Sequence, residues 1–161
     1  MALPEINTIL YTSSLGKHTR PVFRHAVKMA GLYNAKIIML HVVEPIGETG
    51  QALIRNYLPK DLIKTMHDDG LEKVKDNMKE RVAAFYEEEM KMISDRPEVS
   101  IEQVVGEGNR SDEIVEVANE INADLIIMGS HNSLGRSSRT TRQVIKYSER
   151  PVMVIPTRSK K

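Results

Sequence analysis

The run KIIMLHVV, Lys36 to Val43, decides the fold class of this 161-residue chain. Its apolar side chains follow one another directly instead of occupying every second position, which is typical of a strand that helices cover on both faces. A second run of the same kind, DLIIM, covers Asp124 to Met128. Strands buried on both faces occur in parallel sheets, so the sequence predicts an α/β protein.

Three further apolar runs extend the predicted sheet. They cover Thr8 to Tyr11, Pro151 to Ile155 and, more weakly, Val99 to Val105. Segments of helical period separate all these runs, which gives the order βαβαβαβαβ. That order predicts a doubly wound sheet with right-handed crossovers, in which ligands bind beyond the carboxyl ends of the strands.

The expected helices differ in length. The first covers Val22 to Tyr33, and the longest covers Asp61 to Ile93 with Gly70 as a candidate interruption. The acidic run Glu87 to Glu89 is expected on the wet face of this long helix. Ser111 is the expected N-cap of the next helix, because two acidic residues follow it in the first turn.

Composition and length describe one globular domain over residues 1–161, with a surface excursion at 46–60 and a frayed basic tail at 157–161. The net charge of +1 gives no general attraction to nucleic acid or to an anionic membrane. The sequence has no cysteine, and no apolar run approaches the roughly 20 residues that cross a bilayer. We therefore expect a cytoplasmic protein that binds neither nucleic acid nor membrane.

Two polar segments follow strands whose ends are natural neighbours in a doubly wound sheet. These segments run from Thr12 to Gly16 and from Gly129 to Asn132. Beyond the second segment the charge is locally segregated. Between Asp124 and Glu149 every charged residue is basic, namely Arg136, Arg139, Arg142 and Lys146.

The start of the last helix is a candidate anion site. Thr140 and Gln143 form a capping box, which places this start near Ser138 to Thr140. Free amides at a helix N-terminus, nearby hydroxyl groups and arginines can together bind a phosphate. The alternative is that the hydroxyl groups only cap the helix and the arginines line a solvated face.

Three segments, in a specific order, resemble one protein family. They are INTILYTSSLGKHTRPVFRHAVKMA with KIIMLHVVEP, then VVGEGNRSDEIVEVANEINADLIIMGSHN, and finally VIKYSERPVMVIP. On these segments the chain resembles the universal stress protein family over essentially its whole length. The resemblance implies a single doubly wound, five-stranded parallel sheet in the order 3-2-1-4-5, with helices on both faces, of the adenine-nucleotide alpha-hydrolase-like kind. It also implies adenine-nucleotide binding in one branch of the family, and homodimers that often form through the last strand, here Pro151 to Ile155.

The nucleotide-binding branch carries the pattern Gly-x2-Gly-x9-Gly-Ser/Thr, from which this chain departs. Gly129 matches the first glycine, and His131 stands where the family often has histidine. Asn132 replaces the second glycine, which asparagine does best because it tolerates positive φ. Counting back from RPVMVIP places Ser138-Arg139 at the closing Gly-Ser/Thr, so the loop is shortened and its last glycine is missing. Ser14 stands where similar nucleotide binders have an aspartate that faces the nucleoside.

The contacts that the resemblance transfers to this chain form one expected site. They are Ser13, Ser14, Val42, Met128, Gly129, His131, Asn132, Ser138, Arg139, Thr140 and Thr141. The expected ligand is ATP or AMP, and Mg²⁺ or Mn²⁺ would arrive with its phosphates. Arg139 and neighbouring arginines would compensate for the altered loop.

Two functional hypotheses of different classes stay open. The first is a universal stress protein that binds an adenine nucleotide with an altered, shortened phosphate loop and acts in the stress response. The second is a dimeric stress-response module that binds an unknown protein partner and no ATP. We assign no catalytic residue, because the chain has no Walker, GxGxxG, GxSxG or HExxH motif, and at most slow ATP hydrolysis is expected. His41 is expected to be a buried, hydrogen-bonded residue and not a metal ligand.

Overall fold

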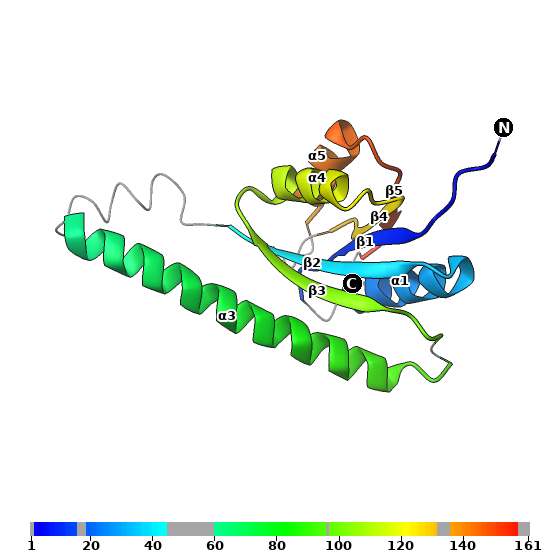
Figure 1. Ribbon diagram of the computed structural model, residues 1–161, viewed down its shortest axis with the longest axis horizontal. Helices are drawn as coiled ribbons and strands as arrows, with labels where there is room; N and C mark the ends of the chain where they lie inside the picture. Colours follow the sequence, from blue (N-terminus) through cyan, green and yellow to red (C-terminus); the bar gives the residue numbers. More distant parts are fainter. Residues whose placement is uncertain (1, 16–18, 45–59, 96, 132–135, 158–161) are drawn as a thin grey trace.

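The computed structural model describes residues 2–15, 19–44, 60–95, 97–131 and 136–157, except the side chains of 60–75. Within these ranges the chain forms one parallel sheet with helices on both faces (Figure 1). Among the helices so described, none is long and apolar enough to cross a membrane.

The sheet has five parallel strands in the order β3-β2-β1-β4-β5, as the resemblance implied. Its strands are β1 (Thr8–Thr12), β2 (Lys36–Val43), β3 (Ile101–Glu107), β4 (Leu125–Gly129) and β5 (Val152–Ile155). The bounds of β2 coincide with the run KIIMLHVV. Only β3 starts appreciably later than expected, because it is an edge strand with mostly exposed or half-buried residues and its apolar signal is correspondingly weak.

The uninterrupted apolar runs supply two hydrophobic cores, one on each face of the sheet. In β2, Ile37 and Met39 enter the core beneath α1 and α3, whereas the alternate residues Ile38 and Leu40 enter the core beneath α4 and α5. Figure 1 shows these two helix pairs on opposite sides of the sheet. The helices are α1 (Arg20–Tyr33), α3 (Lys60–Met92), α4 (Arg110–Glu120) and α5 (Arg139–Tyr147). Each fully buried aliphatic side chain contributes about 1.5–3 kcal/mol, which is why both faces of β2 are mostly apolar.

Two expectations for α3 are wrong. The helix continues through Gly70 without interruption. Glu89 is fully buried, although it belongs to the acidic run expected on the wet face. Its carboxylate lies 3.0 Å from Arg20 Nε and 3.3 Å from Arg24 Nε, both on α1. A buried charge requires such partners, and these two lie far from Glu89 in the sequence.

The starts of α4 and α5 correct both expected caps. Asn109, not Ser111, is the N-cap of α4, and its Oδ1 accepts a hydrogen bond from the Asp112 amide at 3.1 Å. Ser138 is the N-cap of α5, within the expected interval, and its Oγ accepts from the Thr141 amide at 3.1 Å. Thr140 is therefore inside the helix and does not form the capping box. The predicted excursion at 46–60 lies outside the described residues except for Lys60, where α3 begins.

Candidate functional site

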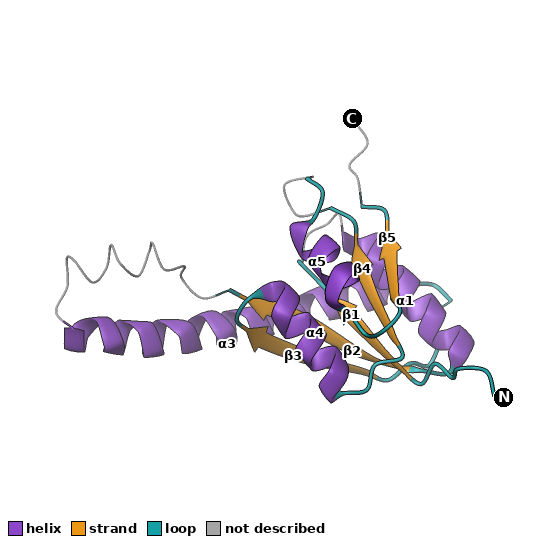
Figure 2. Ribbon diagram, turned by 90° about the horizontal axis from the view of Figure 1, so that it is seen from above, coloured by secondary structure: helices purple, strands orange, loops and turns teal. Residues whose placement is uncertain are grey.

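A cleft of about 690 Å³ opens at the carboxyl ends of the strands. It lies at the switch point between β1 and β4, where the chain order of the sheet reverses. Figure 2 shows the strands fanning apart toward their arrowheads on this side of the molecule. The starts of α4 and α5 also line the cleft, so two helix N-termini face one space.

Every predicted site residue that the structure describes lines this cleft. The set is Ser13, Ser14, Val42, Met128, Gly129, His131, Ser138, Arg139, Thr140 and Thr141. Asn132, the remaining member, lies outside the described residues. Residues from four different elements or their ends, β1, β2, β4 and α5, thus lie around one cleft.

The end of β1 contributes one buried and one exposed serine. Ser13 is 7% exposed, and its Oγ accepts a hydrogen bond from the Leu15 amide at 3.0 Å. Ser14 is exposed and lines the cleft at the position where the family's nucleotide binders have aspartate. A serine hydroxyl can donate or accept there but carries no charge.

His41 on β2 also lines the cleft, which the sequence did not indicate. Its Nδ1 lies 2.6 Å from the Ser13 carbonyl oxygen. Because a carbonyl oxygen only accepts, Nδ1 carries a proton and Nε2 is the acceptor of the neutral ring. Burial lowers the pKa of His41, and the positive charges of Arg110 and Arg81 lower it further. The expectation of a hydrogen-bonded histidine is confirmed, although the ring is only half-buried.

Thr157, which lies in the segment after β5, packs against the end of β4. A Cβ on Gly129 would lie 2.9 Å from Thr157 Cγ2, so only glycine fits there. The His131 amide donates to Thr157 Oγ1 at 2.9 Å, and the Thr157 amide donates to Ser130 Oγ at 3.1 Å. Thr157 is only 6% exposed, so the predicted frayed tail does not include it. The rest of that tail lies outside the described residues.

The start of α5 uses two of the predicted hydroxyl groups for its own structure. Ser138 caps the helix, and Thr141 Oγ1 donates to the Gly129 carbonyl oxygen at 2.8 Å. In this respect the capping alternative is correct. The amides of Arg139 and Thr140 find no acceptor among the described residues, and the exposed Arg139 guanidinium makes no ion pair with them. Both residues line the cleft, so an anion there could accept hydrogen bonds from these donors.

Sequence reasoning missed the opposite wall of the cleft. This wall consists of Glu44 after β2 and of Asn109, Arg110, Ser111 and Asp112 at the start of α4. The Arg110 amide donates to Glu44 Oε1 at 3.4 Å, and Arg110 Nε lies 4.0 Å from the same oxygen. The rule that singled out the ends of β1 and β4 applies equally to β3, whose end leads directly into Asn109.

Metal-binding side chains are sparse in the cleft. Its carboxylates are those of Glu44 and Asp112. In the described part of the chain, no three His, Asp or Glu side chains are grouped so as to hold a metal ion.

Known proteins match this fold and sequence. The model of the universal stress protein family matches residues 5–156. Universal stress protein MJ0577 of Methanocaldococcus jannaschii is 23% identical over 159 residues, which cover 91% of this chain and 93% of that protein. The solved structure of MJ0577 has a TM-score of 0.67, with 22% identity, and the match covers 96% of this chain and 98% of that chain.

Two further solved structures contain bound nucleotides. A universal stress protein in complex with cAMP is 19% identical, with a TM-score of 0.61, and the match covers 95% of this chain and 98% of that chain. A universal stress protein from Archaeoglobus fulgidus in complex with dAMP is 17% identical, with a TM-score of 0.56, and the match covers 95% of this chain and 99% of that chain. At these identities the structures establish the fold alone.

Proposed function

The chain belongs to the universal stress protein family, and from that membership we propose that it binds an adenine nucleotide, ATP or AMP, and acts in the stress response. The observation that carries the proposal is the convergence of the candidate residues on one cleft, where the first amides of α5 have no acceptor among the described residues. The nucleotide complexes of two relatives, with cAMP and with dAMP, support the choice of ligand class.

The phosphates would lie at the start of α5. The positive end of the helix macrodipole, the first amides of the helix and Arg139 all favour negative charge there. Each charge-assisted hydrogen bond contributes about 1.5–3 kcal/mol, so Arg139 can offset weaker phosphate binding by the shortened loop and by Asn132. Mg²⁺ or Mn²⁺ would arrive bound to the phosphates, because the cleft supplies few metal ligands of its own.

The nucleoside would lie between the ends of β1 and β2. Ser13, Ser14 and Val42 form this side of the cleft, with the acceptor Nε2 of His41 beside them. Ser14 offers one neutral hydrogen bond where a carboxylate would fix two ribose hydroxyls. We therefore propose weaker selection for the sugar than in relatives that carry aspartate.

The partner in this proposal is a second copy of the chain, bound through the predicted Pro151 to Ile155 edge. Strand β5 pairs with β4 on one side only, and Val152 to Val154 are half-buried. An edge strand of this kind presents unpaired backbone groups that can pair with another chain.

The alternative function is a dimeric module that binds an unknown protein partner and no ATP. The specific observation in its favour is Ser14, which removes the carboxylate expected to face the nucleoside. Such a module could dimerise through the same β5 edge. The feature that distinguishes the two functions is therefore whether a nucleotide occupies the cleft.

A thermal-shift titration with ATP, ADP and AMP, with and without Mg²⁺, tests the proposal. At a hundredfold excess over Kd, binding should stabilise the fold by about 2.7 kcal/mol, which shifts the melting temperature of a domain of this size by roughly 5–10 °C. No shift at millimolar nucleotide would reject nucleotide binding and favour the alternative module.

A further inference from the structure

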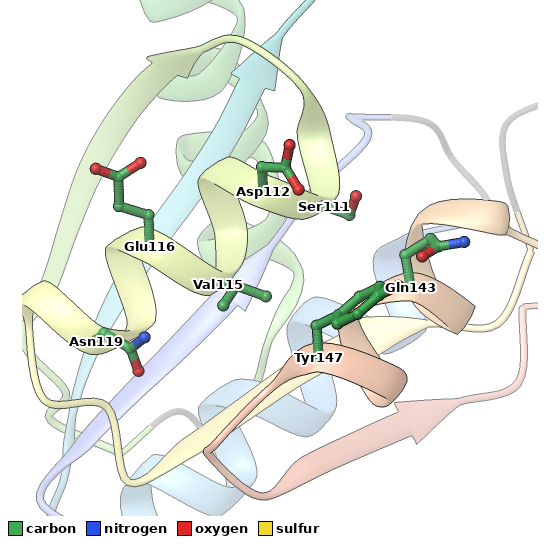
Figure 3. Close-up of a pocket in the computed structure, with 7 residues that line it drawn as sticks. All are labelled: Ser111, Asp112, Val115, Glu116, Asn119, Gln143 and Tyr147. Atoms are coloured by element: carbon green, nitrogen blue, oxygen red, sulfur yellow. The ribbon is translucent and has the colours of Figure 1, made fainter.

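A second cavity of about 330 Å³ lies in a groove between α4 and α5 (Figure 3). Its lining comprises Ser111, Asp112, Val115, Glu116, Asn119, Gln143 and Tyr147. Three of these residues, Ser111, Asp112 and Gln143, also line the cleft, so the two spaces adjoin. Asn119 lies eight positions after Ser111 on α4, which gives the groove a length of about 12 Å at 1.5 Å per residue.

The two spaces differ in charge. The cleft is lined by Arg110 and Arg139 as well as by the carboxylates of Glu44 and Asp112, whereas the charged residues described in the lining of the groove are Asp112 and Glu116. Among the described residues that form the groove, none is positively charged. The groove would therefore repel a phosphate, but its carboxylates can accept hydrogen bonds from neutral hydroxyl and amino groups. Acidic side chains bind ribose hydroxyls in this way in dinucleotide-binding sheets.

The far end of the groove suits an aromatic base. Tyr147 is 59% exposed, Figure 3 shows Val115 pointing toward its ring, and Lys146 Nζ lies 5.2 Å from the ring centroid, so a base would stack on the face that Lys146 leaves open. The side-chain amides of Asn119 and Gln143 flank the same space and offer both donors and acceptors for the edge of a base. Stacking on an aromatic ring accepts any base, whereas the amides can select among them.

We propose that this groove binds a second nucleoside, so that the protein accepts dinucleotides in which two nucleosides are joined through a chain of phosphates. The proposal rests on the proposed nucleotide function of the cleft. One nucleoside occupies the cleft, the phosphates lie over the start of α5 near Arg139, and the second nucleoside stacks on Tyr147 with its ribose facing Asp112 and Glu116. A ligand with an anionic centre and neutral ends would place its phosphates near Arg139 and keep them away from Glu116 in the groove.

Calorimetry with two probes tests the second subsite. The probes are diadenosine 5′,5′-tetraphosphate and adenosine 5′-tetraphosphate, which differ by one nucleoside. We expect the dinucleotide to bind about tenfold more tightly, the equivalent of ~1.4 kcal/mol for one stacked base, which exceeds the roughly twofold advantage of having two identical ends. Tyr147→Ala should remove this excess and leave the affinity for adenosine tetraphosphate unchanged, and Tyr147→Phe should retain it.

Tyr33→Ala is the matched control, because Tyr33 is similarly exposed but lies on α1 and lines neither cavity. Equal affinities for the two probes, or an excess that survives Tyr147→Ala, would overturn the second subsite while the nucleotide function stands. If neither probe nor ATP binds, the nucleotide function itself fails. A Tyr147→Ala variant that loses both affinities equally would show a structural role for the ring and would also overturn the subsite.

Discussion

Helices α4 and α5 begin at the same cleft, yet the residues around their positive ends differ in charge. At α4, two acidic residues, Asp112 and Glu113, occupy the first turn, and Glu44 accepts a hydrogen bond from the Arg110 amide. At α5 the first turn contains no acidic residue, and its first position is Arg139. Both helices are capped, by Asn109 and by Ser138, so the difference is one of charge and not of cap geometry.

This difference indicates which helix end is open to a ligand. The macrodipole of α4 is already opposed by carboxylates of the chain itself, whereas that of α5 has no such compensation within the first turn. A bound anion at the start of α5 would supply the negative charge that the carboxylates of the chain supply at the start of α4. The acidic first turn of α4 also supplies Asp112, a carboxylate that the groove shares with the cleft.

Removing the arginine at α5 should have the largest effect. Arg139→Ala is expected to weaken ATP binding roughly tenfold to a hundredfold, because it deletes one charge-assisted contact to phosphate. At α4, the double variant Glu44→Gln/Arg110→Gln neutralises an ion pair between two half-exposed side chains. We expect that change to alter affinity by no more than about threefold, since exposed pairs contribute little.

Calorimetric titration of both variants measures this comparison. Arg142→Ala is the control on α5, because Arg142 donates to Ser137 Oγ and does not line the cleft. An Arg139→Ala protein with wild-type affinity would remove that side chain from the phosphate site. A loss at α4 as large as the loss at α5 would show that the two helix ends share the ligand.

The two caps should prove equivalent for folding. Ser138→Ala and Asn109→Ala each delete the acceptor for an amide of the first turn, and each should lower the free energy of unfolding by about 1 kcal/mol. Urea denaturation measures both values. A much larger loss at Ser138 would mean that its contact also holds the loop before α5, and the contrast between the helices would then not be one of charge alone.

An acidic residue placed at the start of α5 should make it resemble α4. Thr140→Asp adds a carboxylate to the first turn, which should stabilise the free protein by about 0.3–1 kcal/mol through the macrodipole. The same carboxylate should weaken ATP binding, because it opposes the phosphates. Thr140→Asn keeps the shape without the charge and serves as the control. If Thr140→Asp raised both the stability and the ATP affinity, or lowered both, the result would contradict the idea that a carboxylate and a bound phosphate can replace one another at the start of α5.

The sequence predicted the sheet well because the cause of each strand is local. A run such as KIIMLHVV must bury both of its faces wherever the chain leads, and its observed bounds agree with the prediction. The candidate residues at the ends of β1 and β4 were also accessible, since position beyond a strand end and the family resemblance both point to them.

Features that depend on distant partners were not predictable. Glu89 lies within an acidic run, and only the packing of α1 against α3 supplies the arginines that permit its burial. In the sequence Thr157 looks like part of a frayed end. In the structure it packs against Gly129, where the Cβ of any other residue would be too close to it. At the α4 wall, the strand-end rule could have indicated Asn109, but the ion pair joins Glu44 to Arg110, which are 66 positions apart, and no local pattern predicts it.

The smallest predicted effect concerns His41, which responds to the positive charge at α4. Its folded-state pKa lies below the ordinary value of 6.5 because of burial and because Arg110 and Arg81 are positive. The unfolded chain therefore binds this proton first as the pH falls. The contribution of His41 to stability is complete above pH 6.5 and is lost progressively between 6.5 and the lowered pKa.

Urea denaturation of the wild type and of His41→Asn, compared between pH 7.5 and 5, measures this contribution as a difference between two curves. The variant should lack the part of the slope that begins near pH 6.5. Arg110→Gln should shift the His41 pKa upward, observed in the ring signals by NMR, because it removes one of the opposing charges. An unchanged His41 pKa in that variant would mean that Glu44 already neutralises Arg110, which would make the positive end of α4 still less available to a ligand than that of α5.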